Sequence, residues 1–182
     1  MFRLKSVIAA AILSIGSLLA ASCRPTGAPA LTDQQRAAIT DSVRQLAAGL
    51  AAEVSAHGYR GFPAAMDSAP GYVWAYNGFL PFTSYDSMAA WARSGPEPSR
   101  PEVFAWDSVR VEALAPGIAH FAAGYSETTT DSAGTARTER GVITGVVVHR
   151  SDGWKFANAH TSTLPPPAPA DPAVSRQPRR TG

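Results

Sequence analysis

The sequence predicts an α+β domain in which helices come first and an antiparallel sheet follows. In the first half, apolar residues recur at helical spacing, whereas the residues after 102 form long β-branched and aromatic runs separated by turn residues. The two longest runs flank Ser151-Asp152-Gly153, a composition that closes a hairpin because glycine accepts a positive φ. We therefore expect residues 141–162 to form two central strands of a curved sheet.

A long amphipathic helix is predicted at the start of the domain. Thr32 and Gln35 have the spacing of a capping box, and the pattern stops at residues 57–58. Shorter helical segments are expected at 59–66 and at 85–93. The apolar stripe of the long helix consists of Ile39, Val43, Leu46, Leu50 and Val54. Such a helix can cover the concave face of a curved sheet.

A short hairpin is predicted between the first two helical regions and the third. Segments 72–76 and 79–82 flank Asn77-Gly78, which supplies the two positive-φ positions of a type I′ turn. Pro81 has no amide hydrogen, so the second arm should be short and lie at a sheet edge.

The second half is predicted to contain four strands, at 102–114, 118–130, 135–150 and from 153 onward. Residues 142–148 are apolar on both alternating faces, whereas a half-exposed strand would alternate. We therefore expect helices to cover one face of the sheet and a second subunit to cover the other.

The amino terminus has the features of an export signal. Arg3 and Lys5 precede an apolar run that is short for a membrane span and ends in small residues before Cys23. Residues 19–23 resemble a bacterial lipobox, in which the cysteine is lipidated and becomes the mature amino terminus. Arg24 stands where an inner-membrane retention signal usually has aspartate, so the resemblance implies a lipid anchor in the outer membrane. We expect the domain to face the periplasm. The alternative is a plain secretory signal followed by an incidental cysteine.

These features divide the chain into a signal peptide at 1–22, a tether at 23–31, a folded domain at 32–163 and a disordered Pro/Arg-rich tail at 164–182. The net charge of +2 comes from the two ends, so the folded part is itself mildly acidic. An acidic domain without a Lys/Arg stripe argues against nucleic-acid binding.

The hairpin at the end of the domain carries the pattern Asp-Gly-Trp-Lys followed by His160-Thr-Ser. This pattern resembles the closing strand of SnoaL-like domains, which belong to the nuclear transport factor 2-like superfamily, and the resemblance extends over residues 32–162. It implies a cone-shaped sheet, antiparallel or mixed, with helices closing its concave face around an interior pocket. It also implies frequent dimerisation through the sheet, and uses that range from polyketide cyclisation, steroid isomerisation and epoxide hydrolysis to non-catalytic ligand binding or subunit association.

His160 is the sharpest catalytic candidate, because a histidine near the open end of the last strand can act as a general acid or base. Alternatively, the His160 ring has a structural role and joins the strand to a neighbouring loop by one hydrogen bond. Alternation predicts one inward set on this strand, although a single bulge would reverse it. The set is Trp154, Phe156, Asn158, His160 and Ser162.

An aromatic-lined pocket is predicted, which would suit a flat apolar ligand. His120 shares a face with small residues that leave space, or it lies solvated on the convex side. The expected lining residues are Trp74, Tyr76, Trp106, His120, Tyr125, Asn158 and His160.

Acid–base chemistry on such a fold requires buried carboxylates with shifted pKa values. Glu127 and Glu139 lie at strand positions that are expected to face solvent. None of the acidic residues has an obviously apolar context, and Asp107, beside Trp106, comes nearest to one. No residues have metal-ligand spacing, and neither a glycine-rich phosphate loop nor a nucleophile elbow is present in the sequence. We therefore expect no cofactor and no metal.

Three functions are consistent with these features. The first is a lipid-anchored envelope protein whose cone binds a small, partly apolar molecule without catalysis. The second is a cyclase or isomerase that uses His160 as acid or base, with Tyr76 or Asn158 polarising a carbonyl. The third is a structural module that docks a partner through the face of its sheet.

Overall fold

The computed structural model describes residues 30–95 and 103–165. The predicted signal peptide, the predicted lipidation site Cys23 and most of the predicted tail lie outside these residues. Within the described ranges, no helix has the length and apolar character needed to cross a membrane.

The first described helix, α2 (Asp33–His57), has the predicted capping box. The Gln35 amide donates to Thr32 Oγ1 over 3.2 Å, and the Thr32 amide donates to the Gln35 side chain over 2.8 Å. The helix ends at Gly58, whose φ of 58° is one that glycine adopts readily. Its buried stripe comprises Ile39, Val43, Ala47, Leu50 and Val54.

Two shorter helical elements follow. The 3-10 helix η1 (Gly58–Ala65) continues directly from α2, and α3 (Tyr85–Ser94) comes after the short hairpin. Ser84 caps α3, because its Oγ accepts a hydrogen bond from the Ser87 amide over 3.2 Å.

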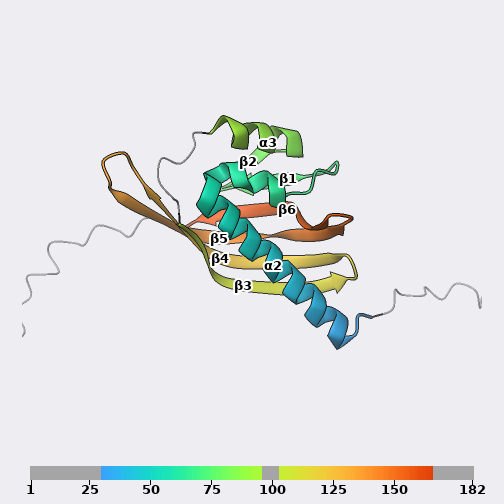
Figure 1. The fold of residues 1–182 in the computed structure, drawn as a ribbon. Helices are drawn as coiled ribbons and strands as arrows, with labels where there is room; N and C mark the ends of the chain where they lie inside the picture. The colour runs from blue at the N-terminus through green and yellow to red at the C-terminus, as the bar shows by residue number, and fades with distance from the viewer. Residues whose placement is uncertain (1–29, 96–102, 166–182) are drawn as a thin grey trace, which may run out of the picture. The chain divides into compact units, whose positions relative to one another are not determined.

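The sheet has six strands in the order β2-β1-β6-β5-β4-β3. It is mixed, because β1 runs parallel to β6 while the other neighbours are antiparallel. The predicted turn is present, with Asn77 at φ 46° and Gly78 at φ 83°, and β2 lies at the edge (Figure 1). The strands are β1 (Val73–Tyr76), β2 (Phe79–Phe82), β3 (Val103–Ala115), β4 (Ile118–Thr130), β5 (Ala136–Arg150) and β6 (Gly153–Thr163).

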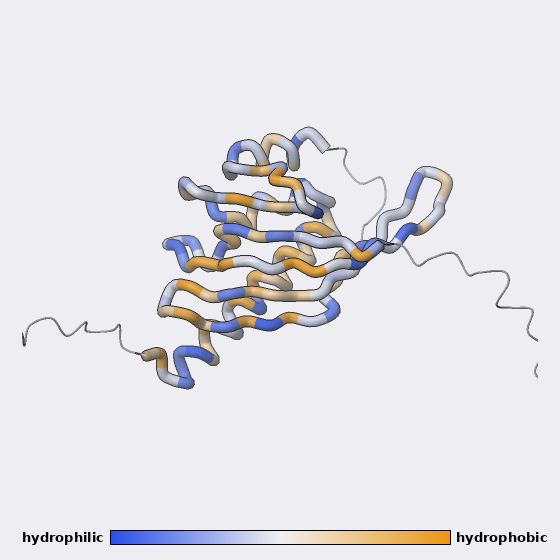
Figure 2. Tube along the Cα trace, turned by 180° about the vertical axis from the view of Figure 1, so that it is seen from behind, coloured by the Kyte–Doolittle hydropathy of each residue, from blue (hydrophilic) through white to orange (hydrophobic). Residues whose placement is uncertain are grey.

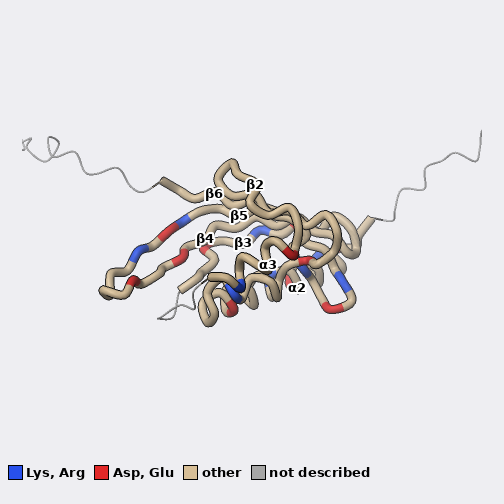
Figure 3. The backbone as a smooth tube through the Cα atoms, turned by 90° about the horizontal axis from the view of Figure 1, so that it is seen from above, with Lys and Arg blue, Asp and Glu red and all other residues tan. Residues whose placement is uncertain are grey.

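The described helices lie on one side of the sheet, which curves over them (Figures 1 and 3). The core fills the space between α2 and the inner face of the sheet, where Phe121, Val147 and Phe156 are fully buried. Trp106 fastens α2 to β3, because its indole nitrogen donates to the Ala47 carbonyl over 2.7 Å. The predicted α+β fold with helices over the concave face is therefore confirmed.

A bulge in β6 corrects the predicted faces of the last strand. Val147 pairs with Phe156 but Val146 pairs with Asn158, so Ala157 is an extra residue in β6. The Val146 amide donates to Asn158 Oδ1 over 3.1 Å. The alternation therefore reverses after Phe156: Ala159 and Thr161 are buried, whereas Asn158, His160 and Ser162 are exposed on the outer face.

Two glycines of β5 bring its neighbouring strands close to its inner face. A Cβ on Gly145 would overlap the Asn158 carbonyl and lie 3.0 Å from Ala159 Cα. A Cβ on Gly141 would overlap the Ser162 carbonyl and lie 2.6 Å from the ring of Tyr125. Both positions are therefore closed to any side chain unless the backbone moves.

Gly145→Ala should lower the free energy of unfolding by about 1–3 kcal/mol, because the added methyl group meets backbone atoms rather than a movable side chain. Gly49→Ala is the matched control, since its Cβ on α2 has nothing within 4 Å and alanine favours the helix. Urea denaturation of both variants measures the difference. Equal stability of Gly145→Ala and the wild type would show that the sheet relaxes there without cost.

An ion pair between a buried aspartate and an exposed arginine joins the segment after η1 to the end of β5. Arg150 donates to both carboxylate oxygens of Asp67, over 2.6 Å and 3.1 Å, and the Asp67 side chain is 6% exposed. The hydrogen bond from Arg150 lowers the pKa of Asp67 below its ordinary value of 3.8, and burial opposes this shift.

The Asp67 carboxylate should stabilise the fold at neutral pH and lose this effect in acid. Asp67→Asn should cost about 1–3 kcal/mol of unfolding free energy at neutral pH. The cost should shrink below about pH 4, because the wild-type carboxylate takes up a proton in the unfolded chain before it does in the folded one. Denaturation curves of both proteins across this range measure the cost, and a pH-independent difference would contradict the assignment.

Candidate functional site

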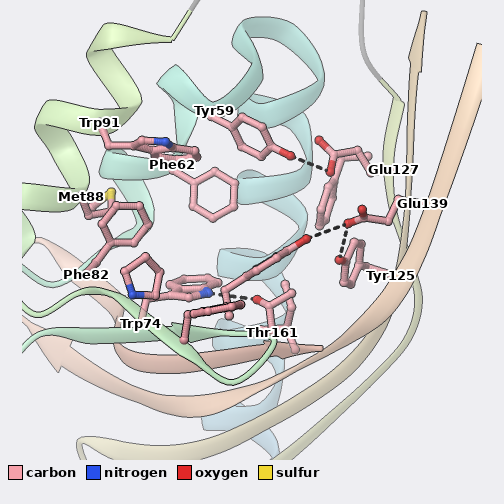
Figure 4. Close-up of a pocket in the computed structure, with 15 residues that line it drawn as sticks. Tyr59, Phe62, Trp74, Phe82, Met88, Trp91, Tyr125, Glu127, Glu139 and Thr161 are labelled. Atoms are coloured by element: carbon pink, nitrogen blue, oxygen red, sulfur yellow. Dashed lines mark hydrogen bonds between the residues drawn. The ribbon is translucent and has the colours of Figure 1, made fainter. Parts of the chain in front are cut away.

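A cavity of about 440 Å³ lies on the inner side of the sheet, beside η1, α3 and the β1–β2 hairpin (Figure 4). Its lining is mostly aromatic and apolar. The lining residues are Tyr59, Phe62, Trp74, Tyr76, Phe79, Pro81, Phe82, Met88, Trp91, Phe104, Tyr125, Glu127, Glu139, Ile143 and Thr161.

Aromatic rings from three elements form one wall of the cavity. The ring centroid of Trp91 on α3 lies 5.1 Å from that of Tyr59 on η1 and 5.1 Å from that of Phe82 on β2. Phe62 and Trp74 continue the wall with centroids 5.5 Å apart. These are ordinary distances for tilted aromatic pairs, so the rings support one another without a ligand.

Trp74 is held in place by a polar contact with β6. Its indole nitrogen donates to Thr161 Oγ1 over 2.9 Å, and both side chains are buried. The contact follows from the parallel pairing of β1 with β6, which puts Trp74 opposite Ala159, and from the bulge, which turns Thr161 inward.

The other end of the cavity carries two carboxylates. Glu127 and Glu139 are direct partners across β4 and β5, and the Glu127 side chain is buried. The Tyr59 hydroxyl donates to Glu127 Oε2 over 3.0 Å. Glu139 Oε1 accepts from the hydroxyls of Tyr125, over 3.0 Å, and Tyr76, over 3.4 Å (Figure 4).

Tyr125 and Tyr76 remain protonated donors across the physiological range. Burial raises the pKa of Tyr125 far above its ordinary value, and the hydrogen bond to Glu139 and that carboxylate's charge raise it further. Burial also raises the pKa of Tyr76, with the charge of Glu139 as the next cause. Each hydroxyl therefore holds its proton and can direct it to the Glu139 carboxylate.

The structure places three of the residues predicted for the pocket on the cavity lining: Trp74, Tyr76 and Tyr125. Trp106 does not line it. Its ring packs edge-on against Phe121, with centroids 5.4 Å apart, and its nitrogen is engaged by α2.

The structure does not place the predicted pocket residues His120, Asn158 and His160 on the lining of the interior cavity. All three are exposed on the outer face, where they border a separate shallow hollow. His120 points outward because Phe121 fills the core, and the β6 bulge turns Asn158 and His160 outward. A catalytic role for His160 stays a prediction that the interior cavity does not support.

Glu127 and Glu139 lie on the inner face of the sheet and line the cavity, whereas the sequence predicted that they face solvent. Glu127 alternates with Phe121, Ala123 and Tyr125, which are all buried, so its position on the inner face was readable once Phe121 was assigned to the core. The cross-strand partner of Glu127 is Glu139. No comparable signal marked Tyr59, which is brought to the site by the end of α2.

In the part of the chain that the structure describes, no cluster of three or more histidine, cysteine, aspartate or glutamate side chains could hold a metal ion.

No family model matches the sequence, and no curated protein matches it. Solved structures do match the fold. An NTF-2 like protein of unknown function from Shewanella oneidensis has a TM-score of 0.54 at 18% identity, over 68% of this chain and 98% of that one. A scytalone dehydratase-like protein from Novosphingobium aromaticivorans has a TM-score of 0.63 at 10% identity, over 74% and 89%. The association domain of CaMKII from C. elegans has a TM-score of 0.58 at 13% identity, over 71% and 99%.

These likenesses cover 68–74% of this chain, at identities that show the fold alone. They agree with the resemblance of the closing hairpin. The chain therefore has the nuclear transport factor 2-like fold.

Proposed function

We propose that this protein binds a small, flat and largely apolar molecule in the cavity of the inner face. The observation that carries the proposal is the aromatic wall formed by Tyr59, Phe82 and Trp91 over a pocket of about 440 Å³. Ligand pockets in proteins have this size range and combine an apolar lining with a few placed polar groups. The polar end at Glu139 provides such groups.

Acid–base catalysis in the same cavity is the second candidate. The hydrogen bond from Tyr125 to Glu139 favours it, because a carboxylate and a phenol can each exchange a proton with a bound molecule. One protein of similar fold is scytalone dehydratase-like. A cyclase or isomerase that depends on His160 has less support, because that side chain lies on the other face of the sheet.

Binding can be tested with 2-naphthalenemethanol, a neutral flat probe, by isothermal titration calorimetry. Trp91→Ala should weaken binding by about 5- to 30-fold, because a stacking partner on the wall is lost. Leu80→Ala is the matched control, since this side chain on β2 is 56% exposed and does not line the cavity. No binding by the wild type, or equal losses in both variants, would contradict the proposal.

We also propose that the outer face of the sheet joins two copies of the chain. No described helix covers this face (Figures 2 and 3). Its centre consists of residues other than Asp, Glu, Lys and Arg, with Val142, Thr144 and Val146 on β5 beside His160 on β6. The C. elegans neighbour is an association domain, which is consistent with self-association of this fold.

Val142→Glu should shift the protein toward monomer, because two like charges would be brought together at the joined faces. Ala48→Glu adds the same charge at an exposed position of α2 and should leave the assembly unchanged. Sedimentation velocity at several concentrations measures the effect. A monomeric wild type at high concentration would remove this part of the proposal.

Lipid attachment through Cys23 completes the proposal. Its support comes from the sequence alone, namely the apolar segment and the lipobox-like residues 19–23. In this arrangement the lipid holds the domain at the outer membrane, and the cavity binds its ligand within the cell envelope.

A further inference from the structure

The charged side chains among the described residues of the cavity lining are of one sign. Among the described residues that line it, Glu127 and Glu139 are the only acidic side chains, and lysine, arginine and histidine do not occur. Glu127 is 6% exposed, so its carboxylate is largely removed from water. A low-dielectric wall beside the Glu139 carboxylate strengthens its attraction for a cation.

Glu139 is held in a defined orientation with one oxygen left for a ligand. Its Oε1 accepts both tyrosine hydroxyls, from Tyr125 on β4 and from Tyr76 on β1 (Figure 4). Its Oε2 accepts no hydrogen bond from any residue of the described ranges.

The aromatic wall adds a second kind of attraction for positive charge. The faces of tryptophan and tyrosine rings carry negative potential and bind ammonium groups, most strongly where water is excluded. Trp74, Trp91, Tyr59 and Tyr76 all line this cavity together with the carboxylates. Tyr59, Tyr76 and Trp91 are 37–43% exposed, so solvent reaches this aromatic wall beside the oriented Glu139 carboxylate. The combination suits an organic cation better than a neutral or anionic molecule.

We propose that the ligand of this cavity is an organic cation, an ammonium group joined to a flat apolar body. The ammonium group lies beside Glu139, and the body lies along the wall formed by Phe82 and Trp91. This inference rests on the proposed binding function and names the chemical class of the ligand. It also implies that the cavity rejects anions of the same shape.

Three probes of one shape separate this inference from simple apolar binding: 2-naphthylmethylammonium, neutral 2-naphthalenemethanol and anionic 2-naphthoate. Calorimetry on the wild type should show the ammonium binding at least about 10-fold more tightly than the alcohol, and the carboxylate most weakly. Added salt should weaken binding of the ammonium more than binding of the alcohol. This comparison needs no variant, so it does not depend on a mutant that folds.

Glu139→Gln should bring the ratio of ammonium affinity to alcohol affinity close to one, and this ratio is the readout because the substitution can also change the affinity for the alcohol. Glu112→Gln is the matched control, because this glutamate on β3 is 69% exposed and lies outside the cavity. Alcohol binding without a preference for the ammonium, or a preference that survives Glu139→Gln, would overturn the cation inference alone. If none of the three probes binds, the proposed binding function fails as well.

Discussion

The cavity depends on how closely β4 and β6 approach β5, and this approach depends on two positions of β5 that have no side chain. At Gly145 the space of a Cβ is taken by the backbone of β6, and at Gly141 it is taken by β6 and by the ring of Tyr125. A side chain at either site would push the neighbouring strands outward. The tyrosine that holds Glu139 therefore lies over a glycine of the adjacent strand, in register with it.

The β6 bulge completes this arrangement by selecting which residues face the cavity. In a regular strand without the bulge at Ala157, alternation from Phe156 would carry Asn158 and His160 inward. With the bulge, Thr161 turns inward and receives the indole hydrogen of Trp74. The bulge thus gives the inner end of β6 a small hydroxyl side chain in place of an imidazole, and it moves the histidine to the face that we propose joins two copies.

Local patterns predicted the elements well. The capping box at Thr32, the turn at Asn77-Gly78 and the boundaries of the long strands are set by residues close in sequence, and all agree with the structure. The predicted inward face of β6 failed after Phe156, because a bulge depends on pairing with β5 rather than on the residues of β6 themselves.

The candidate site was harder to predict because its polar residues come from separate elements. Glu127 and Glu139 meet only once β4 and β5 are in register, and Tyr59 reaches them from η1. A glutamate on a strand is more often solvated than buried. The neighbouring tyrosine hydroxyls show that these two are not typical, and those contacts arise from tertiary structure alone.

The β1–β2 hairpin has a consequence for how a molecule enters the cavity. It contributes Tyr76, Phe79, Pro81 and Phe82 to the lining, yet each strand has four residues, and β2 is an edge strand that hydrogen-bonds only to β1. β1 is held to β6 by its parallel pairing and by the hydrogen bond from Trp74 to Thr161, so only β2 can move while the other strands stay paired. Movement of β2 would shift Phe79, Pro81 and Phe82, and part of the cavity lining can therefore change without loosening the rest of the sheet.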